Sequence, residues 1–283
     1  MFSFFAVLAL ACGDKDISQR HLIFSTIVDG NNGSSIYDLD LRSLKYRELY
    51  VAPLAILSSL TPINEESFLF EILTLPRSKA KIQTFNLKTL QTREICFGLA
   101  PTYMPAHKKF FFYHIPENDF EHLYLADFDD PSSAKMIGND ENKGRRVIAI
   151  SDDEVVFSKE DTFKPNPVYL YNIVTDAIVT LPIASCSAPQ LWRSATRQLL
   201  CFDEVNGSYF LSDLSAENIE EIELPGVPLA YLAESDQLVI RERRTQRARC
   251  GDLYLYDFKN GKQSKIYKNA YSNLGDALCV SVK

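Results

Sequence analysis

The stretch Leu253-Tyr254-Leu255-Tyr256-Asp257-Phe258 decides the fold, because five other stretches of the chain repeat its pattern. The pattern is an apolar residue, usually an aromatic residue, a short spacer, an Asp or Asn, and a closing apolar residue. The other copies are residues 36–41, 82–87, 123–128, 168–173 and 209–214. Their Asp or Asn positions (40, 86, 127, 172, 213 and 257) are 46, 41, 45, 41 and 44 residues apart. A period of about 40–45 residues with strand-like composition is typical of a β-propeller.

Each copy is interpreted as the third strand of a four-stranded blade, because apolar and polar residues alternate with a period of two around it. The Asp or Asn suits a tight turn, since its side chain can accept a hydrogen bond from the backbone two residues on. The predicted fourth strands are Tyr46–Tyr50, Thr92–Phe97, Ala134–Ile137, Ala177–Leu181, Glu220–Leu224 and Gln263–Tyr267. The predicted second strands are Leu22–Val28, Ser67–Leu73, Lys109–His114, Glu154–Ser158, Gln198–Phe202 and Gln237–Arg241.

Five copies have a first strand before the second, across a short polar turn, but the first copy lacks one. The C-terminus offers a spare strand at Asp276–Val282, and pairing it with blade 1 would remove an exposed sheet edge. We therefore predict an all-β fold, a six-bladed β-propeller of four-stranded antiparallel blades. Its ring is closed by the C-terminal strand joining blade 1, and a single propeller domain spans residues 21–283.

The pattern resembles that of the TolB-like six-bladed propellers, a broad group within the WD40-like superfamily. The resemblance covers about residues 20–283 and rests mainly on Leu253-Tyr254-Leu255-Tyr256-Asp257 and Val168-Tyr169-Leu170-Tyr171-Asn172. The aromatic-Ser-Pro-Asp-Gly run usual in the group is absent, and residues 151–153 are its nearest equivalent. The resemblance implies a protein-interaction scaffold. Some propellers are enzymes, however, so the fold alone does not define the function.

Residues 1–12 are interpreted as a signal peptide ending in a lipobox-like segment, and residues 13–20 as a linker. Phe2–Ala11 is almost wholly apolar, too short for a membrane-spanning helix but suited to the apolar region of a signal peptide. The small residues before Cys12 resemble the bacterial lipobox, whose Cys is lipidated and becomes the mature N-terminus. No Lys or Arg precedes the apolar run, which a start site assigned too far downstream would explain. A frayed apolar first strand is the alternative.

The composition argues against several classes of function. A net charge of −7 and a pI near 5.2 disfavour a nucleic-acid binder, which usually needs a strongly basic face. The chain has no G-x-S-x-G elbow and no Gly-rich phosphate loop. His114 and His122 bracket a loop with Glu117, Asp119 and Glu121 that could ligate a metal, but a solvated acidic loop is the favoured interpretation. We therefore expect no cofactor, no metal and no catalytic residues.

The six Cys residues show no C-x-x-C spacing that would indicate zinc or a thioredoxin-like motif. Cys186 and Cys201 flank one predicted hairpin, where they could pair, but we favour buried small hydrophobic residues because the hairpin register does not place them opposite. Trp192, the only Trp, is expected in the core rather than on a sugar-stacking surface.

The most distinctive local feature is a run of five arginines within nine residues of an acidic chain. They are Arg241, Arg243, Arg244, Arg247 and Arg249. The run extends the second strand of blade 6 into the loop before the third, on the face of a propeller that usually carries binding. Because Arg makes forked contacts to carboxylates and phosphates, we expect an anionic partner here. The alternative is a solvated charged hairpin.

The sequence thus predicts a monomeric, non-catalytic propeller of the cell envelope, periplasmic or on the outer surface. It would be held to the membrane only by a lipid on Cys12, and would bind a protein or an anionic ligand on the face with the blade 6 loop. A propeller-type enzyme acting on glycans, a hydrolase or a lyase with its site at the central channel, is the alternative. A cytoplasmic scaffold is the third possibility if the N-terminus is not a signal.

Overall fold

The computed structural model describes residues 7–10, 21–28, 33–41, 43–53, 55–73, 79–114, 122–138, 144–159, 167–184, 186, 188–203, 205–233, 235–242 and 252–267. These residues form strands β1 to β24, which make six four-stranded antiparallel sheets. In each sheet the strands are neighbours in chain order, as expected for propeller blades. The predicted all-β, six-bladed propeller fold is therefore confirmed.

Three blades belong to one compact unit, formed by the residues up to Leu99 and those from Pro225 onward. Blade 1 contains β1 (Val7–Leu10), β2 (His21–Val28), β3 (Gly33–Asp40) and β4 (Tyr46–Ala52). Blade 2 contains β5 (Ile56–Asn64), β6 (Ser67–Leu73), β7 (Lys81–Asn86) and β8 (Gln91–Phe97). Blade 6 contains β21 (Gly226–Leu232), β22 (Gln237–Glu242), β23 (Leu253–Asp257) and β24 (Gln263–Tyr267).

The other three blades form a second unit from Ala100 to Leu224. Blade 3 contains β9 (Leu99–Met104), β10 (Lys109–His114), β11 (His122–Asp127) and β12 (Lys135–Met136). Blade 4 contains β13 (Gly144–Ala149), β14 (Glu154–Lys159), β15 (Val168–Asn172) and β16 (Ala177–Leu181). Blade 5 contains β17 (Ala188–Arg193), β18 (Gln198–Asp203), β19 (Ser208–Ser212) and β20 (Ile219–Ile222). All predicted second and fourth strands agree with these bounds to within two residues at either end.

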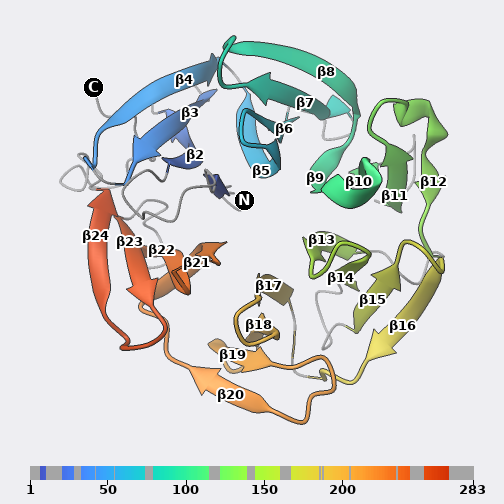
Figure 1. The fold of residues 1–283 in the computed structure, drawn as a ribbon, viewed down its shortest axis with the longest axis vertical. Coiled ribbons are helices and arrows are strands. Elements are labelled where there is room, and N and C mark those ends of the chain that lie inside the picture. The colour runs from blue at the N-terminus through green and yellow to red at the C-terminus, as the bar shows by residue number, and fades with distance from the viewer. Residues whose placement is uncertain are drawn as a thin grey trace. The chain divides into compact units, whose positions relative to one another are not determined.

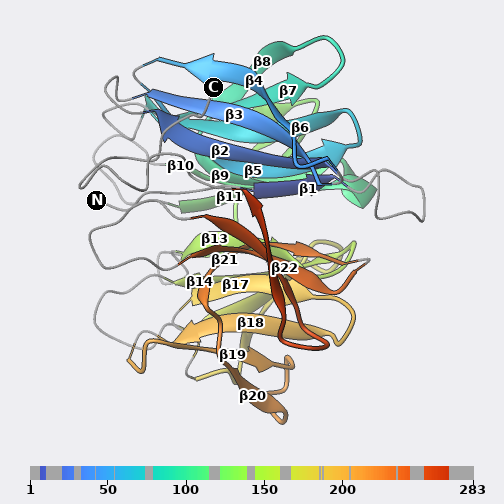
Figure 2. The ribbon, with the colours of Figure 1, turned by 90° about the vertical axis from the view of Figure 1, so that its left-hand side faces the viewer.

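In the first unit, blade 1 lies between blade 2 and blade 6 (Figure 1). Figure 2 shows its strands side by side in the order β4, β3, β2, β1. Alternate residues of β2 and β3 face opposite neighbours, as the period of two requires. Ile23 and Ile36 pack with blade 2 residues such as Phe68, whereas Phe24 and Tyr37 pack with blade 6 residues. Both sides of β2 and β3 therefore carry buried apolar residues, which explains the continuous apolar run Leu22–Phe24.

The second unit is held together in the same way. Val156 and Val168 of blade 4 share a buried cluster with Leu199 and Phe210 of blade 5. Trp192 is partly buried and packs against this cluster, which confirms its predicted place in the core. Blade 3 contacts blade 4 through a hydrogen bond and an aromatic pair. The Thr102 hydroxyl donates to the Val147 carbonyl at 3.1 Å, and the rings of Phe111 and Tyr171 lie 5.8 Å apart.

The repeated Asp or Asn closes turns as predicted. The Oδ1 atoms of Asn86, Asn172 and Asp257 each accept a hydrogen bond from the backbone N–H two residues on, at 2.8 to 3.0 Å. Blade 3 differs, because its turn holds the 3-10 helix η4 (Pro131–Ser133), which Asp130 caps by accepting from the Ser132 N–H at 3.1 Å. Two turns, at Asn206-Gly207 and Asn260-Gly261, place glycine in the left-handed region that favours it, with Gly207 at φ 66° and Gly261 at φ 65°.

The innermost strand of blade 1 differs from the prediction. Val7–Leu10 pairs antiparallel with β2, from Val7 opposite Phe24 to Leu10 opposite His21. The place that we expected the C-terminal strand to fill is therefore taken by an N-terminal segment, the alternative considered for the apolar run. Asp276–Val282 lies outside the described residues, so closure of the ring by the C-terminus stays a prediction.

Candidate functional site

The Arg-rich segment of blade 6 connects the end of β22 to the start of the neighbouring strand β23. Arg241 and Glu242 are the last residues of β22, and Leu253 begins β23. The Glu242 N–H donates to the carbonyl oxygen of Asp252 at 3.0 Å, so the two ends of the connection are held together. Arg243, Arg244, Arg247 and Arg249 lie outside the described residues, as does Cys12.

Asp252 stands at the point where this connection returns to the sheet, and it is only 1% exposed. Its carboxylate pairs with the Lys265 ammonium on β24, which also lies 5.3 Å from the centre of the Tyr254 ring. The hydrogen bond to Asp252 raises the pKa of Lys265 above its ordinary value. A buried carboxylate at the base of the segment is thus neutralised, which reduces its repulsion of an approaching anion.

Gly226, the first residue of β21, lies opposite Glu242 in the ladder. A Cβ atom at position 226 would lie 2.1 Å from the carbonyl oxygen of Arg241, far closer than any real contact. Only glycine permits this approach of β21 to the end of β22. The repeat pattern does not mark Gly226, although a lone glycine at a strand is a recognised sign of close backbone approach.

Arg241 differs from the other four arginines because it belongs to a strand. It lies on the same side of β22 as Val239, which is buried in the cluster between blades 1 and 6. Its Nη1 atom is itself buried. Arg241 is therefore a half-buried residue of strand β22, next to the Arg-rich loop and not within it.

His114 and His122 of blade 3 lie opposite each other at the end of the β10–β11 ladder. His122 is buried, and the His114 ring is 6.1 Å from the Tyr124 ring. Burial lowers the pKa of His114 below its ordinary value. The acidic residues Glu117, Asp119 and Glu121 lie outside the described residues. Within the part of the chain that the structure describes, no three His, Cys, Asp or Glu residues are grouped so as to hold a metal.

Blade 1 contains a polar cluster that the sequence did not reveal. The Asp38 carboxylate, 6% exposed, contacts Nδ1 of His21 at 2.7 Å and accepts from Nε of Arg47 at 3.0 Å. The three residues come from β2, β3 and β4, and the strand register brings them together. Both partners of the buried carboxylate reach the surface, so the cluster joins the three strands at the edge of the blade.

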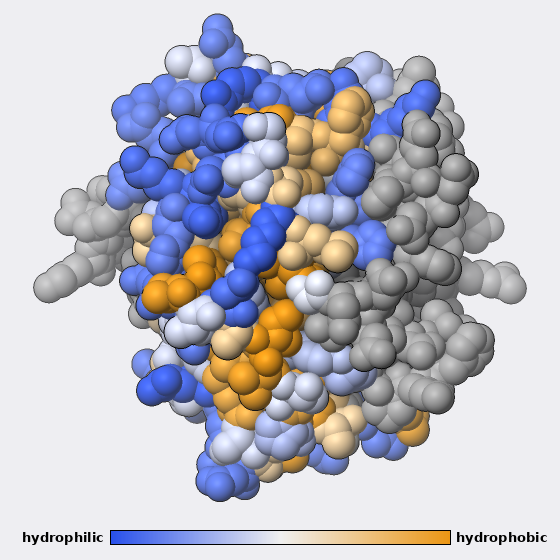
Figure 3. Space-filling model, turned by 90° about the vertical axis from the view of Figure 1, so that its right-hand side faces the viewer, coloured by the Kyte–Doolittle hydropathy of each residue, from blue (hydrophilic) through white to orange (hydrophobic). Residues whose placement is uncertain are grey.

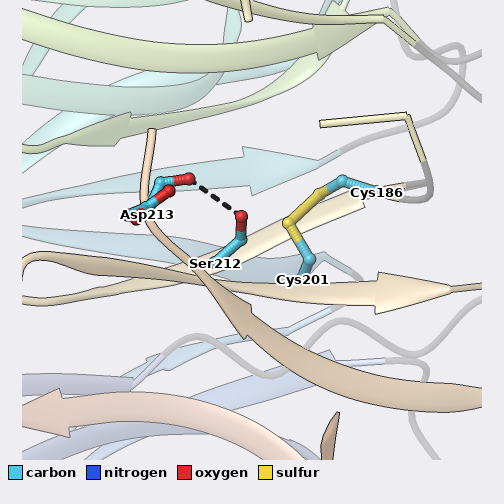
Figure 4. Close-up of a disulfide and its surroundings, with 4 residues drawn as sticks. All are labelled: Cys186, Cys201, Ser212 and Asp213. Carbon is cyan, nitrogen blue, oxygen red and sulfur yellow. Dashed lines mark hydrogen bonds between the residues drawn. A yellow bond between two sulfur atoms is a disulfide. The ribbon is translucent and has the colours of Figure 1, made fainter. Parts of the chain in front are cut away.

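Blade 5 contains a disulfide between Cys186 and Cys201, with the Cα atoms 5.2 Å apart (Figure 4). Both residues are fully buried, as we expected, but the favoured interpretation that they are unpaired is wrong. Cys186 precedes β17 instead of belonging to it, so the hairpin register does not govern its distance from Cys201. Beside this bond the Ser212 hydroxyl donates to the Asp213 carbonyl at 2.8 Å. Cys96 is free, and burial together with Glu94 raises the pKa of its thiol to about 12.

The buried residues of the first strands are largely apolar. They include Leu57 and Leu60 on β5, Met104 on β9 and Leu232 on β21. The buried polar residue on β5 is Ser58. Its neighbour Ser59, which is partly buried and has a φ of 52°, donates a hydrogen bond from its hydroxyl to the buried Glu71 of β6 at 3.1 Å.

The outer strands of the second unit expose single apolar side chains, Met136 on β12, Val179 on β16 and Ile219 on β20. Figure 3 shows one side of the molecule, on which apolar surface lies among hydrophilic side chains. Scattered exposed apolar residues are normal on a protein surface and do not by themselves mark a site. Among the described residues, no helix is long and apolar enough to cross a membrane.

Comparison of the sequence with protein-family models and with curated proteins finds no match. Solved structures do match. TolB from Acinetobacter baumannii has a TM-score of 0.67 at 14% identity, over 85% of this chain and 62% of that one. The chain thus spans less than two thirds of that protein's length.

Two other propellers are similar over most of the chain. A protein described as TolB from Agrobacterium tumefaciens has a TM-score of 0.65 at 10% identity, over 82% of this chain and 88% of that one. An oligogalacturonate lyase in complex with manganese has a TM-score of 0.58 at 13% identity, over 83% of this chain and 73% of that one. At these identities the likeness concerns the fold, and it shows that the chain has the TolB-like six-bladed β-propeller fold.

Proposed function

We propose that this protein is a non-catalytic binding module of the cell envelope that captures an anionic partner with the Arg-rich segment of blade 6. The observation that carries the proposal is the close backbone packing at the base of that segment. Gly226 brings β21 against the end of β22, and the Glu242–Asp252 hydrogen bond joins the two ends of the connection. A run of Arg held at both ends loses less conformational freedom on binding than a free tail would.

The charge at the base of the segment also supports binding of an anion. The deeply buried carboxylate there, Asp252, is paired with Lys265. The chain as a whole has a net charge of −7, so the Arg-rich segment is a local exception in an acidic protein. A carboxylate-rich protein segment is the partner we favour, because Arg forms paired hydrogen bonds with carboxylates.

The envelope location is part of the same proposal. A disulfide such as Cys186–Cys201 is common in oxidising compartments and rare in the cytoplasm of most cells. The apolar run before Cys12 is consistent with export and lipid attachment, by which the monomeric protein would contact the membrane. The mass of the mature N-terminus tests this part, since an intact Met1 would exclude the anchor at Cys12.

The binding proposal is tested with an acidic peptide column. Reversal of Arg243, Arg244 and Arg247 to Glu should weaken retention at least about tenfold, and added salt should weaken retention of the unaltered protein. The matched control reverses Arg197, Lys259 and Lys262, which lie in exposed turns and change the net charge equally. Equal loss in both variants would show that only net charge matters.

An enzyme acting on glycans is the second candidate, favoured by the likeness to oligogalacturonate lyase. Incubation of the purified protein with oligogalacturonate and manganese, followed by absorbance of the unsaturated product, tests it. Product formation that survives the triple Arg reversal would favour a site away from blade 6.

A further inference from the structure

Strand β1 lies in a segment that the proposed export signal would remove. It covers Val7–Leu10, and Cys12 follows two residues later. β1 is the innermost strand of blade 1 and lies beside the innermost strands β5 and β21 of the neighbouring blades. Processing before Cys12 would therefore leave the inner edge of β2 without this strand.

The pairing of β1 with β2 is also incomplete. β2 has eight residues, and only His21–Phe24 pair with β1. Among the described residues, Ser25–Val28 have no partner strand on that edge. An unpaired inner edge would leave backbone N–H and C=O groups unsatisfied next to a buried core.

The other end of the described chain lies close to this edge. Tyr267 is the last residue of β24, and its ring is 5.3 Å from the ring of Phe24 on β2. In blades 2 to 6 every innermost strand follows the outer strand of the preceding blade in the chain. Within the described ranges, blade 1 alone lacks such a strand from its predecessor, which is blade 6.

The chain after β24 is long enough to supply it. Residues 268–275 separate β24 from Asp276, whereas Gly98 alone connects β8 to β9 and residues 182–187 connect β16 to β17. Eight extended residues reach roughly 26 Å. Crossing a four-stranded blade from its outer to its inner strand needs only about 14 Å.

We propose that β1 is a placeholder, and that Asp276–Val282 replaces it beside β2 when the N-terminal segment is removed. The inference rests on the proposed export of the protein. The C-terminal segment has seven residues and can cover more of β2 than the four residues of β1. Its larger apolar residues, Leu278, Val280 and Val282, alternate with small residues, as a strand buried between two neighbours requires. Blade 1 is thus completed by one end of the chain before processing and by the other end afterwards.

The test compares proline variants in two forms of the full chain. One form matures in bacterial cells, and the other is made by cell-free translation under oxidising conditions, where no processing occurs. Cys279→Pro and Val280→Pro are made in each, because N–H groups of successive residues point to opposite edges of a strand and one proline must remove a ladder hydrogen bond. Ser272→Pro, in the connection, is the control.

At least one of the two variants should lower the melting temperature of the processed protein by about 5 °C or more. In the unprocessed chain, the same variant should change the melting temperature by no more than about 1 °C. Ser272→Pro should change the melting temperature of either form by no more than about 1 °C. Equal losses in both forms, or no loss in the processed form, overturn the replacement while the envelope assignment stands. A mature protein that retains Met1 overturns the replacement and the lipid anchor together.

Discussion

The ring of Tyr267 on β24 meets the ring of Phe24 on β2 edge to face, with the ring centres 5.3 Å apart. Tyr46 joins them, 5.7 Å from Tyr267, and Tyr37 lies 5.6 Å from Phe24. These four rings connect the last described strand of the chain to the first blade. The junction between the two ends of the repeat array is therefore aromatic, and it does not depend on the identity of the innermost strand.

Replacing Tyr267 with Ala should lower the free energy of unfolding by about 2 kcal/mol, because the ring is half-buried and its contacts hold blade 6 to blade 1. Urea unfolding followed by fluorescence measures the change. Val205→Ala is the control, since Val205 is 81% exposed and its truncation should change stability by less than about 0.5 kcal/mol. An unchanged midpoint for the Tyr267 variant would contradict a structural role for the junction.

Loss of the Cys186–Cys201 disulfide should destabilise the protein by about 3 kcal/mol, because the bond closes a loop with a sequence separation of 15. The double replacement of both residues by Ala, compared in urea unfolding with the unaltered protein, measures this. Cys96→Ala serves as the control, because Cys96 is free. Intact mass after alkylation without reductant checks the bond itself, and alkylation of Cys201 in the unfolded protein would refute it.

Gly226→Ala should destabilise the protein by about 2 kcal/mol or more, because its Cβ would overlap the Arg241 carbonyl oxygen at 2.1 Å. Gly207→Ala provides a matched comparison. A methyl group at position 207 would meet no atom within 4 Å, but the φ there is 66°, so only left-handed backbone strain, about 1 kcal/mol, applies. Thermal unfolding ranks the two variants, and the reverse order would show that β21 can shift to accommodate a side chain.

Asp176→Asn should lower thermal stability at pH 7. Hydrogen bonds from Lys135 and from the Tyr171 hydroxyl, the latter at 2.8 Å, hold the pKa of Asp176 below its ordinary 3.8. Because the folded-state pKa is depressed, this stabilisation is present above about pH 4 and disappears as the pH falls through the folded-state value.

The difference in melting temperature between the Asp176 variant and the unaltered protein should therefore shrink toward zero near pH 2. Asn keeps the tolerance of a positive φ that position 176 requires, so the substitution tests charge rather than backbone strain. Asp152→Asn, at an exposed position of the same blade, is the control. A pH-independent difference would assign the loss to shape instead of ionisation.

The repeat made most of the fold predictable. Strand alternation and the turn hydrogen bonds of the repeated Asp or Asn act over a few neighbouring residues, so the bounds of the second and fourth strands could be inferred directly. Asn86 and Asn172 make their turn hydrogen bonds for the same local reason. The candidate site was less predictable. A run of Arg indicates local charge, but it does not indicate the backbone contacts at the base of the loop, such as the Glu242–Asp252 hydrogen bond.

The sequence by itself determined that the chain forms six blades and where an Arg-rich segment interrupts the last of them. Only the tertiary structure decided which distant groups meet: Cys186 with Cys201, Asp38 with His21 and Arg47, and Val7–Leu10 with β2. Each of these depends on strand register and on the path of connections between blades. Local patterns of residues determine which segments become strands, but packing of the whole unit decides which strand edges and side chains become partners.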